Sequence, residues 1–227
     1  MNAPHQTIRS YVLRAGRITP AQKQALETLL PRYGIPYAPE PLDLDAAFGR
    51  AAPRTLEIGF GNGDTLVRLA VRHPERDYLG VEVHPPGVGH CLRSIAAQEL
   101  TNVRVIFHDA IEVLEHMIAP AALDEVLLLF PDPWPKKRHH KRRIVRPAFA
   151  SLVASRLAPG GRFRVATDWE PYAASILEVL EACAALENAA PAGGCIERPE
   201  REATRFESRG RRLGHPVFDF EFRRKAG

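Results

Sequence analysis

Short apolar runs alternate with amphipathic stretches from Arg54 onward, and this alternation constrains the fold more than any other feature of the chain. The β-rich runs cover residues 54–58, 78–83, 103–107, 126–130 and 163–167. The stretches with helical spacing cover residues 64–72, 86–99, 110–118, 146–157 and 170–186. Because strands that alternate with helices form βαβ units, we expect an α/β fold with a mostly parallel sheet and helices on both faces.

The two ends of the chain follow other patterns. Thr19 and Pro20 open a helix that we expect to end near Leu30. Residues 31–53 contain five prolines, which disfavour long regular structure and are typical of a connector. Residues 217–222 alternate with a period of two, as in a strand at the sheet edge or next to it. We predict an N-terminal extension and connector over residues 1–53 and one large domain over residues 54–227.

The composition is that of a soluble globular protein, because 45% of the 227 residues are hydrophobic and 26% are charged. The longest apolar run, Val126–Phe130, is far shorter than the roughly 20 residues of a membrane helix, and residues 1–17 lack the apolar core of a secretory signal. The cysteines, Cys91, Cys183 and Cys195, are odd in number and far apart, which disfavours disulfides and favours the reducing cytoplasm.

A glycine-rich loop, LEIGFGNG at residues 56–63, follows the first predicted strand. Glycines at alternate positions let the backbone turn tightly and approach a bound molecule. The spacing G-x-G-x-G differs from the G-x-G-x-x-G of dinucleotide loops, and the carboxylate of Glu57 is a poor neighbour for a diphosphate. Glu57 suits a cationic ligand or an ammonium group better. The alternative is a turn that is rich in glycine for its geometry alone.

Acidic residues also follow the next two predicted strands. Glu82 is placed to accept the two hydroxyls of a ribose, and Asp109 is placed to receive an adenine amino group. Each could instead be an ordinary exposed carboxylate. Together with Glu57, however, they follow three successive parallel strands, whose carboxyl ends meet at the crevice where open α/β sheets bind ligands. The sequence therefore predicts a nucleoside site at this edge.

The fourth predicted strand leads into a proline-rich loop, Pro131–Pro135, and then into a basic segment, residues 136–146. The prolines stiffen the loop around Asp132 and Trp134. Seven Lys or Arg residues lie in the basic segment, and because the whole chain carries +4, the rest of it carries −3. Such a segment is either a solvated surface or a track for the phosphates of a polyanion. Trp134 either stacks on a base or packs on the core.

Further polar residues follow the fifth predicted strand and precede the last one. Asp168 ends the fifth strand, and residues 204–207 mix a hydroxyl, a cation, an aromatic ring and an acid without periodicity. This second stretch is either a binding loop or a solvated surface turn. His139 and His140 have no third metal ligand at a suitable spacing, so we expect no metal site.

These motifs resemble the bacterial tRNA (guanine-N7)-methyltransferases. The resemblance runs from about Arg9 to Phe222. Its markers are LEIGFGNG at 56–63, GVEVHPPGVG at 80–89, HDA at 108–110, FPDPWPKKRHHKRR at 130–143, TDWEPYA at 167–173 and TRFESRG at 204–210. It implies a Rossmann-like class I methyltransferase fold that binds S-adenosylmethionine, and it implies methylation of the N7 atom of guanine 46 in the variable loop of tRNA.

The resemblance also implies roles for individual residues. The cofactor-binding positions would be Glu57, Gly59, Gly61, Gly63, Glu82, Asp109 and Asp132, and Asp132 would also be the catalytic residue. The substrate-binding positions would be Lys136, Arg138, Asp168, Thr204, Arg205, Phe206 and Glu207. The RNA-contact positions would be Lys137, Arg138, His139, His140, Lys141, Arg142 and Arg143.

Two other classes of protein fit part of the pattern. A nicotinamide-dependent oxidoreductase shares this type of sheet, but the glycine spacing, Glu57 and the basic segment disfavour it. A non-catalytic RNA-binding module would explain the basic segment but not the acids at the strand ends. We expect tRNA as the partner, no contact with a membrane, no obligate protein partner, and a monomer or homodimer in the cytoplasm.

Overall fold

The structure of the 227-residue chain is a computed structural model. It describes residues 9–12, 17–190, 194–196, 204, 207, 214 and 216–226. Arg205 and Phe206, which belong to the predicted binding loop, lie outside these ranges.

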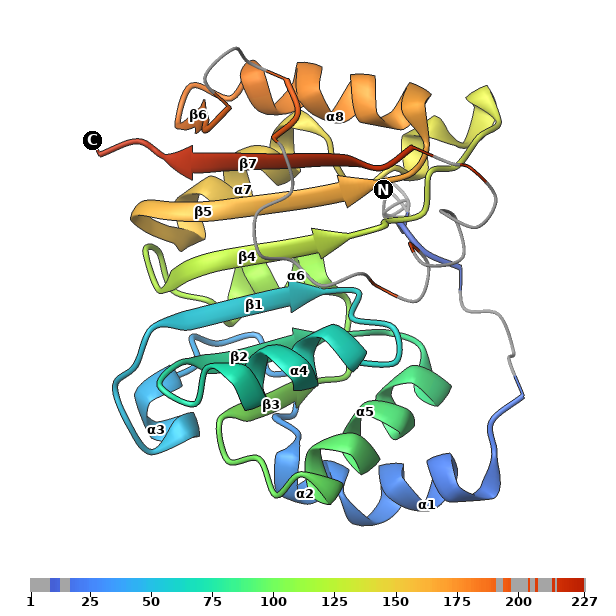
Figure 1. The fold of residues 1–227 in the computed structure, drawn as a ribbon. Coiled ribbons are helices and arrows are strands. Elements are labelled where there is room, and N and C mark those ends of the chain that lie inside the picture. The colour runs from blue at the N-terminus through green and yellow to red at the C-terminus, as the bar shows by residue number, and fades with distance from the viewer. Residues whose placement is uncertain are drawn as a thin grey trace, which may run out of the picture.

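A seven-stranded sheet in the order β3-β2-β1-β4-β5-β7-β6 forms the centre of the molecule (Figure 1). Its strands are β1 (Arg54–Ile58), β2 (Asp77–Val81), β3 (Val103–Ile106), β4 (Leu123–Leu129), β5 (Leu157–Thr167), β6 (Leu186–Asn188) and β7 (Phe218–Arg224). The first five strands pair in parallel, whereas β7 is antiparallel to both β5 and β6. The prediction of a mostly parallel sheet is therefore confirmed.

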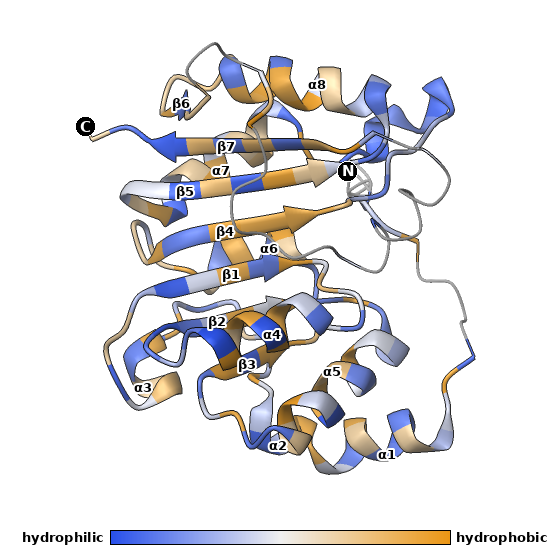
Figure 2. Cartoon of the chain, in the orientation of Figure 1, coloured by the Kyte–Doolittle hydropathy of each residue, from blue (hydrophilic) through white to orange (hydrophobic). Residues whose placement is uncertain are grey.

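Helices cover both faces of this sheet, as predicted. They are α1 (Pro20–Thr28), α2 (Leu30–Tyr33), α3 (Leu44–Phe48), α4 (Asp64–Arg72), α5 (Pro85–Ala97), α6 (Ala110–His116), the 3₁₀ helix η1 (Lys137–Arg142), α7 (Pro147–Arg156) and α8 (Glu170–Glu181). One buried hydrophobic cluster joins α1, α4 and α5 to the sheet, and a second joins α6, α7 and α8 to it. Figure 2 shows that the C-terminal half of β4, between these clusters, is strongly hydrophobic.

Alternation along the strands decides which side chain enters which cluster. Leu56 and Ile58 of β1 belong to the cluster with α6, α7 and α8, so Glu57 between them points to the opposite face. The same rule confirms the prediction for β7, whose Phe220 and Phe222 are buried in that cluster. Glu221 of β7 lies on the other face, where its Oε2 accepts a hydrogen bond from Nε of Arg164 at 2.9 Å.

The helix predicted at Thr19 and Pro20 is present, and its capping box with Gln22 is complete. It packs closely on α5, because a Cβ added at Gly89 would lie 2.6 Å from the Gln22 carbonyl oxygen. The N–H of Ile35 donates to the Val105 oxygen at 2.9 Å, which ties the following segment to β3. Residues 19–35 therefore pack against the sheet domain, and the domain boundary at residue 53 stays a prediction.

The predicted extent of the helix over residues 170–186 is wrong, and the connector contains short helices that the sequence did not indicate. We expected a helix over residues 170–186, but α8 ends at Glu181, and Leu186 begins β6, which pairs with β7. Residues 31–53 also contain short helices, of which α3 has Asp43 as its N-cap and Gly49 at its end with φ +73°. Propensity alone did not indicate these features, because strand pairing overrides the helical spacing and proline masks the short helices.

No helix in the described part of the chain combines the length and the apolar character that crossing a membrane requires.

Candidate active site

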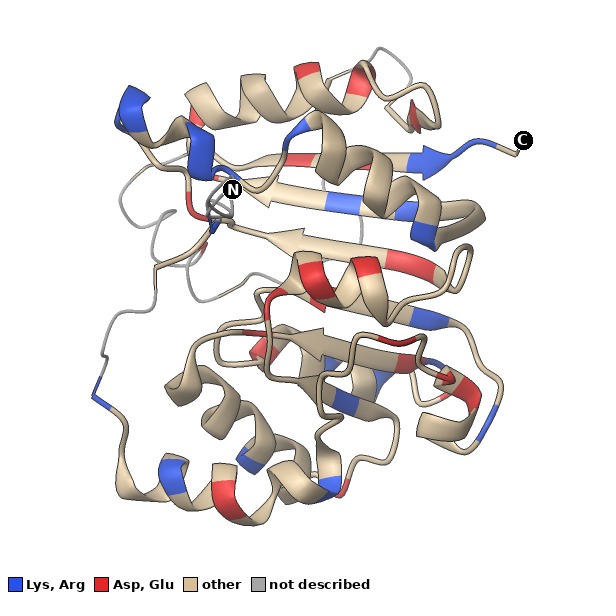
Figure 3. Cartoon of the chain, turned by 180° about the vertical axis from the view of Figure 1, so that it is seen from behind, with Lys and Arg blue, Asp and Glu red and all other residues tan. Residues whose placement is uncertain are grey.

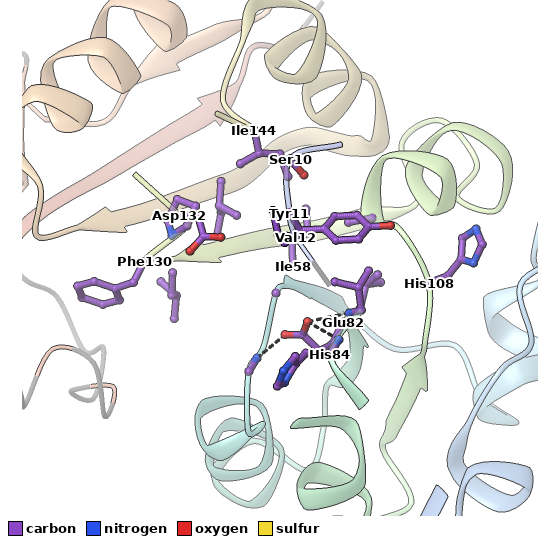
Figure 4. Close-up of a pocket in the computed structure, with 18 of the residues that line it drawn as sticks. Ser10, Tyr11, Val12, Ile58, Glu82, His84, His108, Phe130, Asp132 and Ile144 are labelled. Atoms are coloured by element: carbon purple, nitrogen blue, oxygen red, sulfur yellow. Dashed lines mark hydrogen bonds between the residues drawn. The ribbon is translucent and has the colours of Figure 1, made fainter. Parts of the chain in front are cut away.

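The carboxyl ends of the parallel strands surround a cavity of about 510 Å³ (Figure 4). The residues that line it come from the ends of the strands, from the loops that follow them, and from the N-terminal segment 9–12. They are Ser10, Tyr11, Val12, Ile58, Gly59, Gly61, Val81, Glu82, Val83, His84, His108, Ala110, Leu128, Leu129, Phe130, Pro131, Asp132, Trp134 and Ile144. The cavity lies where the sequence predicted a nucleoside site.

The glycine loop forms one wall of this cavity. Gly59, Gly61 and Gly63 have φ angles of +68°, +58° and +78°, which side chains other than glycine rarely adopt. Among the described residues, apart from the neighbours in the chain, no atom lies within 4 Å of a Cβ added at Gly59 or Gly61. Gly63 instead packs against Cys91 of α5, where an added Cβ would lie 2.3 Å from the sulfur. The first two glycines therefore leave room for a ligand, and the third allows helix packing.

Glu82 joins the glycine loop to the loop that follows β2. Its Oε2 accepts a hydrogen bond from the N–H of Gly61 at 2.8 Å, and its Oε1 accepts from the N–H groups of Val83 at 2.7 Å and His84 at 3.0 Å (Figure 4). Because each carboxylate oxygen has two lone pairs, further acceptor capacity faces the cavity. Glu82 therefore has both a structural role and the position that we predicted for a ribose contact.

Asp109 is placed at the N-terminus of α6, where its Oδ1 accepts from the N–H of Ile111 at 2.8 Å. The hydroxyl of Tyr11 also donates a hydrogen bond to its side chain. Burial raises the pKa of Tyr11, and the charge of Asp109 raises it further. Figure 4 shows the Tyr11 ring within the cavity, pointing toward His108. The N-terminal segment thus contacts the residue that we predicted for the adenine amino group.

Glu57, which we predicted to contact the cofactor, does not line the cavity. Its side chain points toward α4 and α5 and is 3% exposed, and its Oε2 has no hydrogen-bond partner among the described residues. Burial raises the pKa of Glu57 to about 8, and the charge of Glu82 contributes in the same direction. Glu57 is therefore mostly protonated at neutral pH, and the strand alternation explains why it faces away from the cavity while Ile58 faces it.

The buried carboxyl of Glu57 predicts how stability depends on pH. Between pH 4.5 and about 8 the unfolded chain releases a proton that the folded chain keeps, so the free energy of unfolding falls as the pH rises. The slope reaches about 1.4 kcal/mol per pH unit from this one group. We expect Glu57→Gln to lose this contribution, as measured by urea unfolding without cofactor at pH 5 to 8. Exposed Glu178→Gln should keep the wild-type slope, and an unchanged slope in Glu57→Gln would contradict the assignment.

The proline-rich loop forms the wall that carries Asp132. Figure 4 shows the Asp132 side chain at the cavity, on a different wall from Glu82. The loop is flanked by two residues with left-handed backbone, Phe130 at φ +55° and Trp134 at φ +45°. Such conformations cost roughly 1–3 kcal/mol each and persist only where the surroundings hold them. The contacts that keep Phe130 and Trp134 in these conformations therefore also restrict the loop that carries Asp132.

The basic segment begins directly after this loop, and η1 forms its first part. Figure 3 shows that Lys and Arg make up much of the ribbon of η1, and no residue of η1 is buried. Trp134 is enclosed by this segment, because Arg142 lies over its ring at 5.2 Å, His139 meets it edge-on at 5.8 Å, and its Nε1 donates to the Ser10 oxygen at 3.1 Å. Loss of solvent and the surrounding cations lower the pKa of His139. The exposed cations of η1 form a surface that suits a polyanion.

Arg143 differs from the other basic residues and corrects our prediction that it contacts RNA. Its side chain is 6% exposed, and its Nε donates to the Pro133 oxygen at 2.9 Å. Its guanidinium carbon lies 4.7 Å from the centre of the Tyr172 ring. Burial at the end of η1 turns this arginine inward, beneath the proline-rich loop, and away from the surface that an RNA would meet.

The remaining substrate positions that the structure describes, Lys136, Arg138, Asp168, Thr204 and Glu207, are not among the residues that line the cavity. Asp168 follows β5 at the same edge of the sheet. Glu207 is fully buried, and its N–H donates to the Thr204 hydroxyl at 3.1 Å. Among the described residues, no group of three His, Cys, Asp or Glu is arranged to hold a metal ion.

Sequence reasoning missed several residues of the cavity. His84 and His108 follow β2 and β3, so the rule that predicted Glu82 and Asp109 could also have found them. Ser10, Tyr11 and Val12 had no such signal, because they lie in a segment without periodicity that reaches the cavity only through the tertiary fold.

Solved structures define the class of protein to which this fold belongs. The 16S rRNA methyltransferase KamB aligns with a TM-score of 0.56 at 16% identity, over 93% of this chain and 96% of that chain. An rRNA methylase from Streptococcus thermophilus aligns with a TM-score of 0.52 at 12% identity, over 77% of this chain and 87% of that chain. The chain has the Rossmann-like fold of class I methyltransferases.

Sequence comparisons narrow this class to one family. The model of the family described as "Putative methyltransferase" matches residues 51–220. The tRNA (guanine-N(7)-)-methyltransferase of Nitrosospira multiformis is 55% identical over 227 residues, which cover 100% of this chain and 98% of that protein. The protein of the same name from Thiobacillus denitrificans is 58% identical over 219 residues, 96% of each chain. The chain belongs to the tRNA (guanine-N(7)-)-methyltransferase family.

Proposed function

We propose that this chain transfers a methyl group from S-adenosylmethionine to the N7 atom of guanine 46 in the variable loop of tRNA. The observation that carries the proposal is that the cavity at the strand ends lies next to the exposed basic segment. Glu82 and the glycine loop form one wall, Asp132 stands on another, and the exposed basic segment continues from the Asp132 loop. A small cofactor and a large polyanion would therefore meet at Asp132.

The cavity suits S-adenosylmethionine in size and in chemistry. Its volume of about 510 Å³ lies within the range of small-molecule sites. Gly59 and Gly61 leave room beside the backbone, and Oε2 of Glu82, which accepts one backbone hydrogen bond, keeps acceptor capacity for a ribose hydroxyl. Asp109 lies between His108 and Ala110, which line the cavity, and its carboxylate has acceptor capacity beyond its hydrogen bonds to Ile111 and Tyr11 that an adenine amino group could use.

Bound in this cavity, S-adenosylmethionine supplies an electrophilic methyl group on a sulfonium centre. The N7 atom of guanine has a free lone pair, so no proton has to leave before attack and no strong general base is needed. The residues must orient the purine, which can account for roughly 7–11 kcal/mol of the barrier. They must also stabilise the positive charge that develops on the purine, and the carboxylate of Asp132 is placed to do so.

We further propose that the enzyme acts in the cytoplasm as a monomer or homodimer, without an obligate protein partner. The proposal for the compartment rests on the sequence, in which three cysteines are odd in number and far apart.

The proposal is tested by incubating the protein with labelled S-adenosylmethionine and a tRNA transcript that carries guanine 46. We expect one labelled 7-methylguanosine in the digested product and none with a transcript in which adenine replaces guanine 46. Label in a different nucleoside would overturn the proposed reaction. Label in 7-methylguanosine from both transcripts would overturn the proposed position.

The basic segment predicts a change in the salt dependence of tRNA binding. Replacing Lys136, Lys137 and Arg138 by glutamine should lower the slope of log affinity against log salt concentration by about 2, because each phosphate contact contributes about 0.7–0.9. Filter binding over a series of salt concentrations measures this slope. The matched control replaces three exposed cations elsewhere, Lys23, Arg93 and Lys225, and should keep the wild-type slope. Equal slopes for both triple variants would place the RNA on another surface.

A further inference from the structure

We propose that Arg143 is a positioning residue, which holds the proline-rich loop so that Asp132 faces the substrate. This inference rests on the proposed function, because it assumes that Asp132 acts in methyl transfer. It assigns to Arg143 a role different from that of the exposed cations that precede it in the basic segment.

The contact between Arg143 and Pro133 supports this role directly. The carbonyl that accepts from Nε of Arg143 at 2.9 Å belongs to the peptide bond between Pro133 and Trp134. The orientation of this peptide determines the φ angle of Trp134, which is +45°. Because a tryptophan rarely adopts this conformation, the peptide needs a partner that holds it. Without Arg143 we expect the peptide to rotate toward a relaxed conformation and to shift Asp132, one residue before Pro133.

The ring of Tyr172 on α8 makes a second contact with Arg143. The Tyr172 ring is fully buried, and its hydroxyl accepts a hydrogen bond from the N–H of Val145 at 3.3 Å. The guanidinium lies over this ring at 4.7 Å, an arrangement in which the ring attracts the cation. Burial raises the pKa of Tyr172 to about 12, and the charge of Asp132 also raises it. The loop carboxylate therefore lies within electrostatic reach of the residue that supports Arg143.

Arg142 and Arg143 are adjacent in the chain but face different parts of the protein. Arg142 remains partly exposed and lies over the Trp134 ring, whereas Arg143 turns inward to the Pro133 carbonyl. The Nη2 of Arg143 is buried and has no hydrogen-bond partner among the described residues. Leaving such a donor unpaired destabilises the fold, so the guanidinium is not placed there for stability alone. Its placement is explained by the loop that it holds.

The test compares Arg143→Gln with Arg142→Gln, which removes the same charge at the adjacent residue. For Arg143→Gln we expect a 10- to 100-fold lower single-turnover rate at saturating tRNA and cofactor, because a small misplacement of a reacting group can cost about 100-fold. Its tRNA affinity and salt slope should match those of the wild type. For Arg142→Gln we expect weaker tRNA binding and a smaller salt slope. The reverse pattern, or an unchanged rate in Arg143→Gln, would overturn the proposal.

A second measurement follows the loop without tRNA. In a Trp169→Phe background Trp134 is the remaining tryptophan of the chain, so its fluorescence reports on the loop. We expect Arg143→Gln to increase the quenching of Trp134 by acrylamide, and Arg143→Lys, which can still donate to Pro133, to show a smaller increase. Quenching equal to that of the parent would overturn the proposal even if the rate falls. Because this readout needs no methylation, it separates failure of this inference from failure of the proposed function.

Two further variants distinguish a loss of folding from a loss of loop positioning. If Arg143→Gln fails to fold, Arg143→Lys and Tyr172→Leu replace it, since both disturb the support of Arg143 without leaving a neutral polar group beneath the loop. Each should lower the single-turnover rate per cofactor-binding site, counted by titration. A loss of sites with a normal rate per site would show a purely structural role and overturn the proposal.

Discussion

Asp132→Asn should slow the methylation of tRNA by about 100- to 1,000-fold at saturating cofactor while it leaves the binding of tRNA nearly unchanged. Asparagine has almost the same size and fits the same loop, so the main change is the loss of one negative charge. This charge matters most in the transition state, when the purine becomes cationic. In the ground state the guanine is neutral, and the carboxylate contributes little to its binding.

Hydrogen bonds hold the backbone of the proline-rich loop on both sides of Asp132. The N–H of Phe130 donates to the Ala166 oxygen at 2.8 Å, and the Pro133 carbonyl is held by Arg143, so the backbone on both sides of Asp132 is fixed. We therefore expect the asparagine variant to keep the loop conformation. Rapid-quench measurement of a single turnover, together with separate binding assays for tRNA and cofactor, distinguishes the rate from the affinities.

Glu178→Gln on α8 is the matched control, because it removes one exposed carboxylate far from the cavity. It should retain the wild-type rate and affinities. Equal losses of rate and of tRNA affinity in Asp132→Asn would count against a role in the transition state. They would indicate instead that Asp132 shapes the surface that binds the RNA.

The fold could be predicted from the sequence because the signals that define it are local and repeated. Each of the five parallel strands has an apolar run, and the amphipathic stretches between them match α4 to α8 closely at their N-terminal ends. The residues at which helices and strands end depend also on tertiary contacts, which local sequence patterns do not show. Leu186 leaves the predicted helix because it pairs with Arg224 of β7, which lies far along the chain.

The sequence predicted those residues of the candidate site that directly follow a parallel strand. Glu82 and Asp132 follow β2 and β4, and both line the cavity. Glu57 precedes the end of β1 by one residue, and this single step turns its side chain to the opposite face. The alternation of side chains along β1 can be predicted from the sequence, whereas the glycine motif indicates only that Glu57 lies near the loop, so its contact with the cofactor stays a prediction.

Other residues could not be assigned from the sequence. Arg143 is one cation in a dense run, and only the tertiary structure distinguishes a guanidinium that lies on Tyr172 from its exposed neighbours. Tyr11 reaches Asp109 from nearly one hundred residues away, and no local pattern predicts such a contact. The inward arginine and the N-terminal tyrosine therefore depend on long-range packing, which composition and spacing do not encode.

Glu82→Gln should weaken binding of S-adenosylmethionine by about 100-fold or more, because the carboxylate has two functions that an amide cannot combine. It accepts three backbone hydrogen bonds, from Gly61 on one oxygen and from Val83 and His84 on the other. Hydrogen bonds to a charged group contribute roughly 1.5–3 kcal/mol each. In glutamine one oxygen becomes an NH₂ group, which meets backbone N–H donors and cannot accept from them or from a ribose hydroxyl.

Glu82→Gln should lower the affinity for the cofactor more than it lowers the rate of methyl transfer. We expect isothermal titration to show the weaker binding and thermal unfolding without cofactor to show a midpoint lower by about 5 °C, since 1 kcal/mol shifts the midpoint of a chain of this size by about 2–4 °C. Glu40→Gln, which changes an exposed carboxylate in the connector, should show neither effect.

Saturating cofactor separates the role of Glu82 from that of Asp132. With the cavity filled, Glu82→Gln should reach a single-turnover rate within about tenfold of the wild type, because Asp132 and the loop that carries it are intact. Asp132→Asn should remain slow at any cofactor concentration. If Glu82→Gln binds the cofactor normally but remains as slow as Asp132→Asn, then Glu82 acts on the reacting groups themselves, and its assignment to the cofactor ribose is wrong.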